Sequence, residues 1–370
     1  MFNIKSNLLI RLFFLVVGLV CVSSTFAALL PNGTTAYLDI TVNHAQVSET
    51  DNNFLYQFKV PLDAKMKAAC DSAKNFVVCT STDTSKFPRV VKLYPTKDTL
   101  LLYVNAPKST TIDRVYRLCS GKTISAVNSA SAFTNDDIVN FYGFDEFANG
   151  ATSADFAGGN TATINSPCTI GNSGQFGNSA MVGISNVVRT GNNAFLSGAT
   201  QFTISTIVKH PNYTANQTTL TWSTYVNVNI NSGYYTVYFT GGADCCFTSQ
   251  PPANTFWMLT YMYNGSGATN SDKIKCYVNG NAVTLTFTGT IPASMGVVSA
   301  PVIFGRLGAV NNYVDNALIC SSIKSPGSES DRYKMLFTPS TFATFGSGFS
   351  VGSGGGRKVN NLSTGLKLGL

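Results

Sequence analysis

The sequence predicts an all-β protein that consists of two consecutive β-sandwiches. Short runs of alternating apolar and polar residues recur along the 370-residue chain, and clusters of Asn, Gly, Pro and Ser separate them. Charged residues account for only 12% of the chain, as many as the aromatic residues. A chain of this length exceeds one ordinary domain, so we expect two.

Residues 1–27 have the pattern of a cleaved signal peptide. Lys5 and Arg11 precede an apolar run over residues 12–22. Ala27 provides the small residue that a signal peptidase reads. Because the run is too short to span a bilayer comfortably, a cleaved leader is favoured over a membrane anchor. We expect export to the periplasm, the cell surface or the extracellular space, with no membrane span in the mature chain.

Residues 28–122 carry the strands of the first predicted sandwich. Runs rich in Val, Leu, Tyr and Phe are separated by Pro, Asn and Gly at regular spacing, a pattern typical of sandwiches. The expected strands cover residues 37–42, 52–62, 76–83, 87–95, 99–107 and 114–122. Residues 123–140, rich in Ser, Ala and Asn, form the expected linker.

The second predicted sandwich is organised around residues 256–280. The first run in this stretch alternates bulky with smaller or polar side chains, which favours a strand with one face on a core. Asn264-Gly265 and Asn279-Gly280 end two successive runs. Asn-Gly favours a type I′ hairpin turn, because both residues tolerate a positive φ. We therefore expect an antiparallel meander that continues through residues 283–287.

This stretch resembles the core of laminin-G-like, concanavalin A-type jelly-roll domains, where a strand of the form W-hydrophobic-x-hydrophobic-T-Y precedes K-x-Y-V-N-G. Ile207 stands where that family usually has a second tryptophan. Further segments match the family in the same order, at residues 144–146, 174–185, 202–210, 301–306, 314–323 and 330–337. The resemblance covers residues 141–345 and implies a jelly roll that binds glycans or proteins.

The segments on either side of this region are less distinctive. Residues 28–122 resemble an uncharacterised secreted β-domain that commonly precedes laminin-G-like domains, through residues 54–62, 102–107 and 115–121. That family has no assigned activity, so the resemblance implies architecture alone. Residues 346–370 are rich in Gly and Ser and form either a flexible tether or, at their end, an added edge strand.

Eight cysteines remain once the leader is removed, and an even number favours disulfides in an oxidising compartment. Cys70 and Cys79 flank a short loop and are the first expected pair. Cys119 with Cys168 would tie the two units together.

The other four cysteines lie in the second unit. Cys245 and Cys246 are adjacent, so a bond between them would be strained. We expect them to pair with Cys276 and Cys320, in either assignment. Zinc is not expected, because the chain has no C-x-x-C pair and only two histidines.

The charge pattern argues against a nucleic-acid partner. The formal net charge is +7, and the basic residues are scattered, without a Lys/Arg stripe or interleaved aromatic residues. A mildly cationic, solvated surface is the interpretation that this pattern favours.

The carboxylates do not predict catalysis. Glycoside hydrolases of similar architecture need two carboxylates about 5 Å apart for a retaining mechanism. The chain has three glutamates, at positions 49, 146 and 329. None shares a strand with another carboxylate at a suitable spacing, and the adjacent Asp145 and Glu146 would point to opposite faces. No serine-hydrolase constellation with a partnered histidine is evident, and we interpret His44 and His210 as turn or surface residues. We expect no catalytic residues and no required cofactor.

Binding residues are expected around the run YYTVYF. A strand there places Tyr234 and Tyr238 on one face and Tyr235 on the other, and one face must belong to the core. The following loop, residues 240–252, is long enough to build a site and contains Asp244. Aromatic rings stack on sugars while polar groups supply hydrogen bonds. These four residues are the candidate ligand-binding set, with a merely solvated face as the alternative.

A calcium site follows from the family resemblance alone. In the resembling families, calcium binds where the opening strand meets the closing strand, which implies Asp315 facing residues 141–146. Calcium takes six to eight oxygen ligands, so carbonyl groups and water would supply most of them. The alternative is that Asp315 only accepts hydrogen bonds from neighbouring amides.

The sequence thus favours a secreted or surface-exposed, non-catalytic binding or adhesion protein that recognises glycan or protein ligands. One alternative is a structural component of an extracellular or phage-associated assembly, in which both sandwiches are spacers. Another is a divergent glycoside hydrolase whose carboxylates lie outside the familiar motif.

Overall fold

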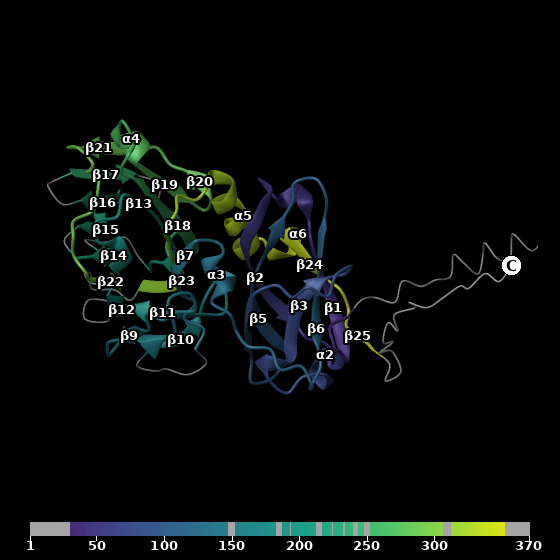
Figure 1. Ribbon diagram of the computed structural model, residues 1–370. Coiled ribbons are helices and arrows are strands. Elements are labelled where there is room, and N and C mark those ends of the chain that lie inside the picture. Colours follow the sequence, from purple (N-terminus) through teal and green to yellow (C-terminus); the bar gives the residue numbers. More distant parts are fainter. Residues whose placement is uncertain are drawn as a thin grey trace, which may run out of the picture.

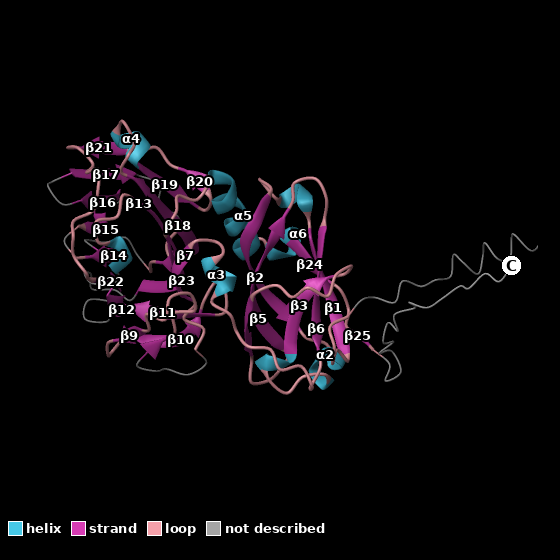
Figure 2. Cartoon of the chain, in the orientation of Figure 1, coloured by secondary structure: helices cyan, strands magenta, loops and turns pink. Residues whose placement is uncertain are grey.

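The computed structural model describes residues 30–146, 152–182, 187–192, 194–211, 217–223, 225–231, 234–239, 243–247, 252–305 and 312–351. Most of its regular structure is β-strand, in antiparallel sheets that form two units lying side by side (Figures 1 and 2). The expected all-β class is confirmed. The expected leader and residues 352–370 of the expected tail lie outside the described residues.

The first unit contains two sheets around one core. Its strands are β1 (Ala36–Val42), β2 (Asp51–Pro61), β3 (Phe76–Thr80), β4 (Arg89–Leu93), β5 (Thr99–Lys108) and β6 (Arg114–Ser120). One sheet has the order β2-β5-β4, and in the other β6 lies between β1 and β3. Buried and half-buried residues alternate strictly along β1, because side chains of a strand point to opposite faces in turn.

The C-terminal segment completes the first unit. It forms α5 (Pro326–Phe337), α6 (Pro339–Phe342), β24 (Ala343–Phe345) and β25 (Phe349–Ser350). Both strands pair with β1, with Ile40 opposite Phe345 and Tyr37 opposite Phe349. The expected division placed residues 141–345 in the second sandwich and residues 346–370 in a tail. The structure differs because Phe342 is buried in the core of the first unit and the edge of β1 gains a partner.

The second unit has two large sheets that enclose a second core. An eight-stranded sheet has the order β10-β11-β23-β13-β18-β19-β20, with β7 paired to β23. A nine-stranded sheet has the order β21-β17-β16-β15-β14-β22-β12-β9-β8. The bounds are β7 (Ile138–Tyr142), β8 (Thr152–Ser153), β9 (Ala162–Ile164), β10 (Thr169–Ser173), β11 (Asn178–Val182), β12 (Val188–Asn192), β13 (Gln201–Lys209), β14 (Gln217–Trp222), β15 (Val226–Asn231), β16 (Tyr234–Phe239), β17 (Ala243–Phe247), β18 (Phe256–Asn264), β19 (Ile274–Val278), β20 (Asn281–Ala282), β21 (Thr286–Thr288), β22 (Pro301–Phe304) and β23 (Asn312–Cys320).

The expected meander is present in part. β18 pairs with β19, and β19 turns at Asn279-Gly280 into β20. Both turn residues have the positive φ that Asn-Gly was expected to supply, 52° and 73°. The third run does not stay in this sheet: β21 pairs with β17 of the nine-stranded sheet. The chain therefore crosses from one sheet of the second unit to the other after Ala282.

Two elements lie within the expected linker, residues 123–140. These are α3 (Ser131–Thr134) and the start of β7. Phe133 and Ile138 are fully buried, which explains why this segment is ordered against both units. The remaining short helices are η1 (His44–Gln46), α2 (Ala64–Ala68), η2 (Ala73–Asn75), η3 (Ala194–Leu196) and α4 (Asn270–Lys273). Within the described ranges, no helix has the length and apolar character needed to cross a membrane.

The core of the first unit extends onto the eight-stranded sheet of the second. Phe141, Ile207 and Leu318 of the second unit belong to the same buried cluster as Tyr56 and Tyr103 of the first. The ring of Tyr103 lies 5.3 Å from that of Phe141. The two units are therefore joined by packed side chains.

Candidate functional site

The nine-stranded sheet has an outer face that is polar where β15, β16, β17 and β21 lie together. In β15, Val226, Val228 and Ile230 point into the core, and Asn227 and Asn229 between them are half-buried. The same alternation continues in β17, whereas in β16 Tyr234 is exposed, Tyr238 is half-buried and Thr236 between them is buried. These strands lie on the side of the molecule away from the first unit (Figure 1).

The strand register arranges the outward residues in two rows. In the first row, Asn227 lies opposite Tyr238, Tyr238 opposite Asp244, and Asp244 opposite Thr288. The second row runs in the same way across Asn229, Thr236, Cys246 and Thr286. Neighbouring members of a row are on strands about 4.8 Å apart. We call these eight residues, together with Tyr234, the Asn–Tyr face.

Three of the four predicted ligand-binding residues lie on this face. Tyr234 is 48% exposed, and Tyr238 and Asp244 are half-buried. Tyr235 is fully buried: its ring stacks on Phe247 at 5.2 Å and meets Trp257 edge-on at 4.8 Å. Tyr235 is thus a core residue, because it lies on the face that closes the sandwich.

The predicted loop over residues 240–252 contains a strand instead. Asp244 lies within β17, and its neighbours Ala243 and Cys245 are buried. The alternation in ADCCF covers only five residues. It is hard to see in the sequence, because the buried Cys245 and the half-buried Cys246 are the same type of residue. The position of Asp244 is therefore set by pairing on both sides, to β16 and β21.

The asparagines of β15 were missed by the sequence analysis. Asn227 contributes an amide to the first row and Asn229 to the second, and the hydroxyl of Thr218 donates to the side-chain Oδ1 of Asn229 at 2.8 Å. The signal was present in the run VNVNIN, which alternates a β-branched residue with Asn at every step. A strand with amides along one face predicts a surface rich in hydrogen-bond donors and acceptors.

Asp315, the predicted calcium ligand, lies on β23 and is fully buried. Its Oδ2 accepts a hydrogen bond from the backbone N–H of Phe176 at 2.9 Å. Its Oδ1 has no hydrogen-bond partner among the described residues. Burial and the neighbouring Asp145 carboxylate raise the pKa of Asp315 well above its usual value.

Asp145 is a second buried carboxylate beside this position. It follows β7, and its oxygens accept hydrogen bonds from the N–H of Asn178, at 3.0 Å, and from the Tyr103 hydroxyl. Burial raises the pKa of Asp145 to about 7. The backbone N–H groups of Phe176 and Asn178 thus connect Asp315 with Asp145, which lies in the expected opening segment. Within the described part of the chain, no group of three or more His, Cys, Asp or Glu side chains has a metal-binding arrangement.

The eight cysteines of the described residues have free thiols, and in the first unit their neighbours differ from those expected. Cys79 lies beside Cys119 on the adjacent strand, with 3.9 Å between the two sulfur atoms. The expected pair of Cys79 with Cys70 is not formed, since the Cys70 thiol points to the Lys67 carbonyl. Cys119 is therefore not placed to bond with Cys168.

In the second unit, Cys245 and Cys276 approach each other from the two sheets. Both are buried, and their thiols lie within hydrogen-bonding reach. Cys246 points outward on the Asn–Tyr face. Cys320 is buried beside Lys324 and Arg332. Of the open assignments, the structure favours Cys245 with Cys276.

The glutamates serve separate structural contacts. Glu329 is fully buried and accepts a hydrogen bond from the Thr260 hydroxyl at 2.7 Å. Glu49 lies 3.6 Å from Lys108, and the Glu146 carboxylate accepts from the Ser153 hydroxyl at 3.0 Å. His210, expected at a turn or surface, is fully buried against the rings of Tyr235 and Trp257.

No protein-family model and no curated protein matches the chain. Among solved structures, it is similar to the receptor-binding domain of botulinum neurotoxin D, with 12% identity and a TM-score of 0.44 over 54% of this chain and 52% of that one. It is also similar to the ligand-binding domain of botulinum neurotoxin serotype D in complex with N-acetylneuraminic acid, with 13% identity and a TM-score of 0.44 over 56% and 52%. The chain spans about half the length of these structures. At TM-scores below 0.5, these similarities support no conclusion about activity or ligand.

Proposed function

We propose that this protein is exported and binds glycans, without catalysis, through the Asn–Tyr face. The observation that carries the proposal is the pair of polar rows across four strands. Four strands at about 4.8 Å spacing extend over roughly 14 Å, which suits an oligosaccharide better than a single sugar. Tyr234 and Tyr238 offer rings for stacking, and the amides, hydroxyls and Asp244 carboxylate offer hydrogen bonds to sugar hydroxyls.

Two features of the sequence support this proposal. The pattern of residues 1–27 supports export, which would bring the face into contact with extracellular glycans. The resemblance of residues 141–345 to laminin-G-like domains supports a binding module with a concanavalin A-type jelly roll. A protein ligand on the same face is the runner-up, since strand faces of this type also bind proteins.

A glycan array tests the proposal, with wild type and the variants Tyr238→Ala and Asn227→Ala. We expect each variant to bind the recognised glycan at least about tenfold more weakly, which corresponds to about 1.4 kcal/mol. Tyr313→Ala is the matched control, because Tyr313 is also a half-buried strand tyrosine but lies on the other sheet. If wild type binds no glycan, or if Tyr238→Ala binds as wild type does, the proposal is wrong; the first result would favour a structural role in an assembly.

A further inference from the structure

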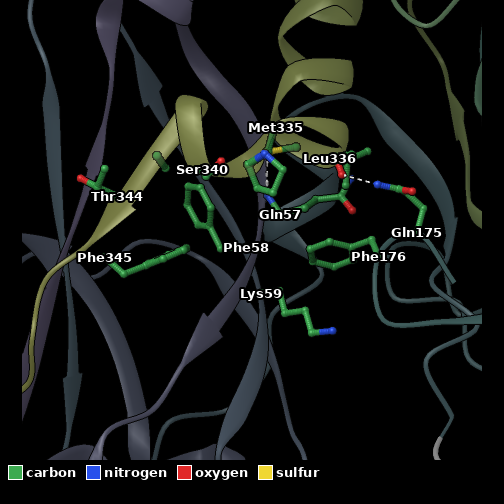
Figure 3. A pocket seen from close by; sticks show the side chains of 12 residues that line it. Gln57, Phe58, Lys59, Gln175, Phe176, Met335, Leu336, Ser340, Thr344 and Phe345 are labelled. Atoms are coloured by element: carbon green, nitrogen blue, oxygen red, sulfur yellow. Dashed lines mark hydrogen bonds between the residues drawn. The ribbon is translucent and has the colours of Figure 1, made fainter. Parts of the chain in front are cut away.

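A cavity of about 440 Å³ lies where the two units and the C-terminal segment meet. One wall is β2, which is the edge strand of its sheet. The second unit contributes Gln175 and Phe176, and the segment from Met335 to Phe345 closes the remaining side (Figure 3). This cavity is distinct from the Asn–Tyr face, which lies on the opposite side of the second unit. Cavities of this size between domains are common sites for small molecules.

Gln57 of β2 places an unpartnered carboxamide in this wall. The residue is 1% exposed, and neither its Nε2 nor its Oε1 makes a hydrogen bond with the described residues. The neighbouring Gln175 behaves differently, because its Nε2 donates to the Leu336 carbonyl at 3.0 Å. A buried donor and acceptor left without partners cost free energy, which a ligand with matching groups would recover.

The rest of the lining is mostly apolar and aromatic. The rings of Phe58 and Phe345 lie 6.1 Å apart at 87°. Figure 3 shows these two rings on one side of Gln57 and the ring of Phe176 on the other. Exposed Lys59 also lines the cavity, which places a cation at the solvent side. The walls therefore suit a flat, apolar body, and the carboxamide would fix its orientation.

We propose that this cavity binds a small, flat, largely apolar molecule whose edge has an N–H beside a C=O, as in a lactam or a cyclic imide. A carboxamide presents a donor and an acceptor side by side in one plane. An N–H/C=O edge pairs with both at once. A carboxylate would place its lone pairs against the Gln57 Oε1, and a hydrocarbon would leave both atoms unpaired.

Three bicyclic probes of similar size test this inference by calorimetric titration of the full-length protein. Isoquinolin-1(2H)-one has the N–H/C=O edge, its N-methyl derivative lacks the donor, and naphthalene lacks both groups. We expect wild type to bind isoquinolinone at least about tenfold more tightly than the N-methyl derivative. Gln57→Leu should lose this preference and bind naphthalene at least as well as wild type does. Gln201→Leu is the control, since Gln201 is an exposed glutamine outside the cavity.

The inference is overturned if wild type does not bind isoquinolinone up to its solubility limit, or binds both lactams equally. It is also overturned if Gln57→Leu retains the preference. If Gln57→Leu does not fold, nuclear magnetic resonance of the wild-type protein with bound isoquinolinone tests whether the probe lies in this cavity. Nuclear Overhauser effects from isoquinolinone to the rings of Phe176 and Phe345 are expected, and binding without such contacts would place the probe elsewhere.

Discussion

Among single residues, Asp145 and Asp315 are two carboxylates that lie in the interior of the protein. Both are fully buried, and each disfavours the charge of the other. A proton on one of them, or a cation between them, relieves this repulsion. The calcium expected from the family resemblance would fit here better than at Asp315 alone, because Asp145 adds a second carboxylate and the Asp315 Oδ1 has no hydrogen-bond partner among the described residues.

When a chelator removes any calcium, we expect the protein to be less stable at pH 8 than at pH 5. Burial raises the pKa of Asp145 to about 7 in the folded state, whereas an unfolded Asp has a pKa of about 3.9. Between these values the folded state holds more protons than the unfolded state, so stability falls as the pH rises. The two neighbouring charged groups have opposite effects on the pKa of Asp145: Lys92 lowers it and Glu146 raises it.

Thermal melts at the two pH values check this expectation. Asp145→Asn should flatten the pH dependence, because the amide does not titrate. Millimolar calcium should raise the melting temperature more at pH 8 than at pH 5, since a ligand that binds only the folded state stabilises it. An unchanged melting temperature with calcium, in wild type and in Asp315→Ala alike, would remove the ion from this site.

Among the elements, α5 shows how buried charges hold a helix in place. Asp331 of α5 lies 2.6 Å from the Lys108 ammonium of β5, and both side chains are fully buried. The ammonium also lies 4.4 Å from the Phe54 ring centroid, and Asp331 accepts from the Ser48 N–H at 2.7 Å. The helix is thus fixed to the first unit by charge-assisted contacts that exclude water.

Asp331→Ala is expected to lower the free energy of unfolding by about 3–5 kcal/mol, because it leaves the Lys108 ammonium buried without its closest partner. Urea denaturation of wild type and variant measures this difference in the free energy of unfolding. The double variant Lys108→Met, Asp331→Leu should recover most of the loss, since neither charge of this buried pair remains. Lys334→Ala is the control: Lys334 is partly exposed and 4.0 Å from Asp331, so less than about 1 kcal/mol is expected. An Asp331→Ala protein as stable as wild type would contradict this role.

Strands β3 and β6 are expected to form a disulfide in an oxidising compartment. The Cys79 and Cys119 sulfurs are 3.9 Å apart on neighbouring strands and 40 residues apart in sequence. Glutathione disulfide would serve as the oxidant: two protein thiols lose their protons and two electrons, and the oxidant is reduced to two thiols. Closing a loop of this length stabilises by about 4 kcal/mol in the chain-entropy description. Mass spectrometry of a non-reduced digest should find this linkage; a Cys70–Cys79 linkage would show the pairing is wrong.

At the scale of the whole molecule, the two units are less independent than the order of the sequence suggests. The buried cluster of the first unit includes side chains of the eight-stranded sheet, and β24 returns from the end of the chain to pair with β1. The chain therefore begins and ends its described part in the same unit. Separation of the halves would expose apolar surface and the edge of β1 together.

If the chain is cleaved between the two units, the two fragments should remain associated. Val127 is 75% exposed, so a protease site inserted after it can be cleaved in the folded state. We expect the two fragments to elute together in gel filtration without denaturant, and to separate in urea. Elution as two folded species would show that the shared core contributes little to holding the units together.

Local patterns in the sequence determined the strand content, the Asn279-Gly280 turn and the alternation that places Tyr234 and Tyr238 on one face. They did so because turn propensity and the period of two act over a few residues. The tertiary structure decided which face of β16 is buried, so it assigned Tyr235 to the core and brought Asn227 beside Tyr238. It also decided the cysteine neighbours and the return of the C-terminal segment to β1. Such contacts join residues far apart in the chain, where the gain from burial, and not local propensity, selects the partner.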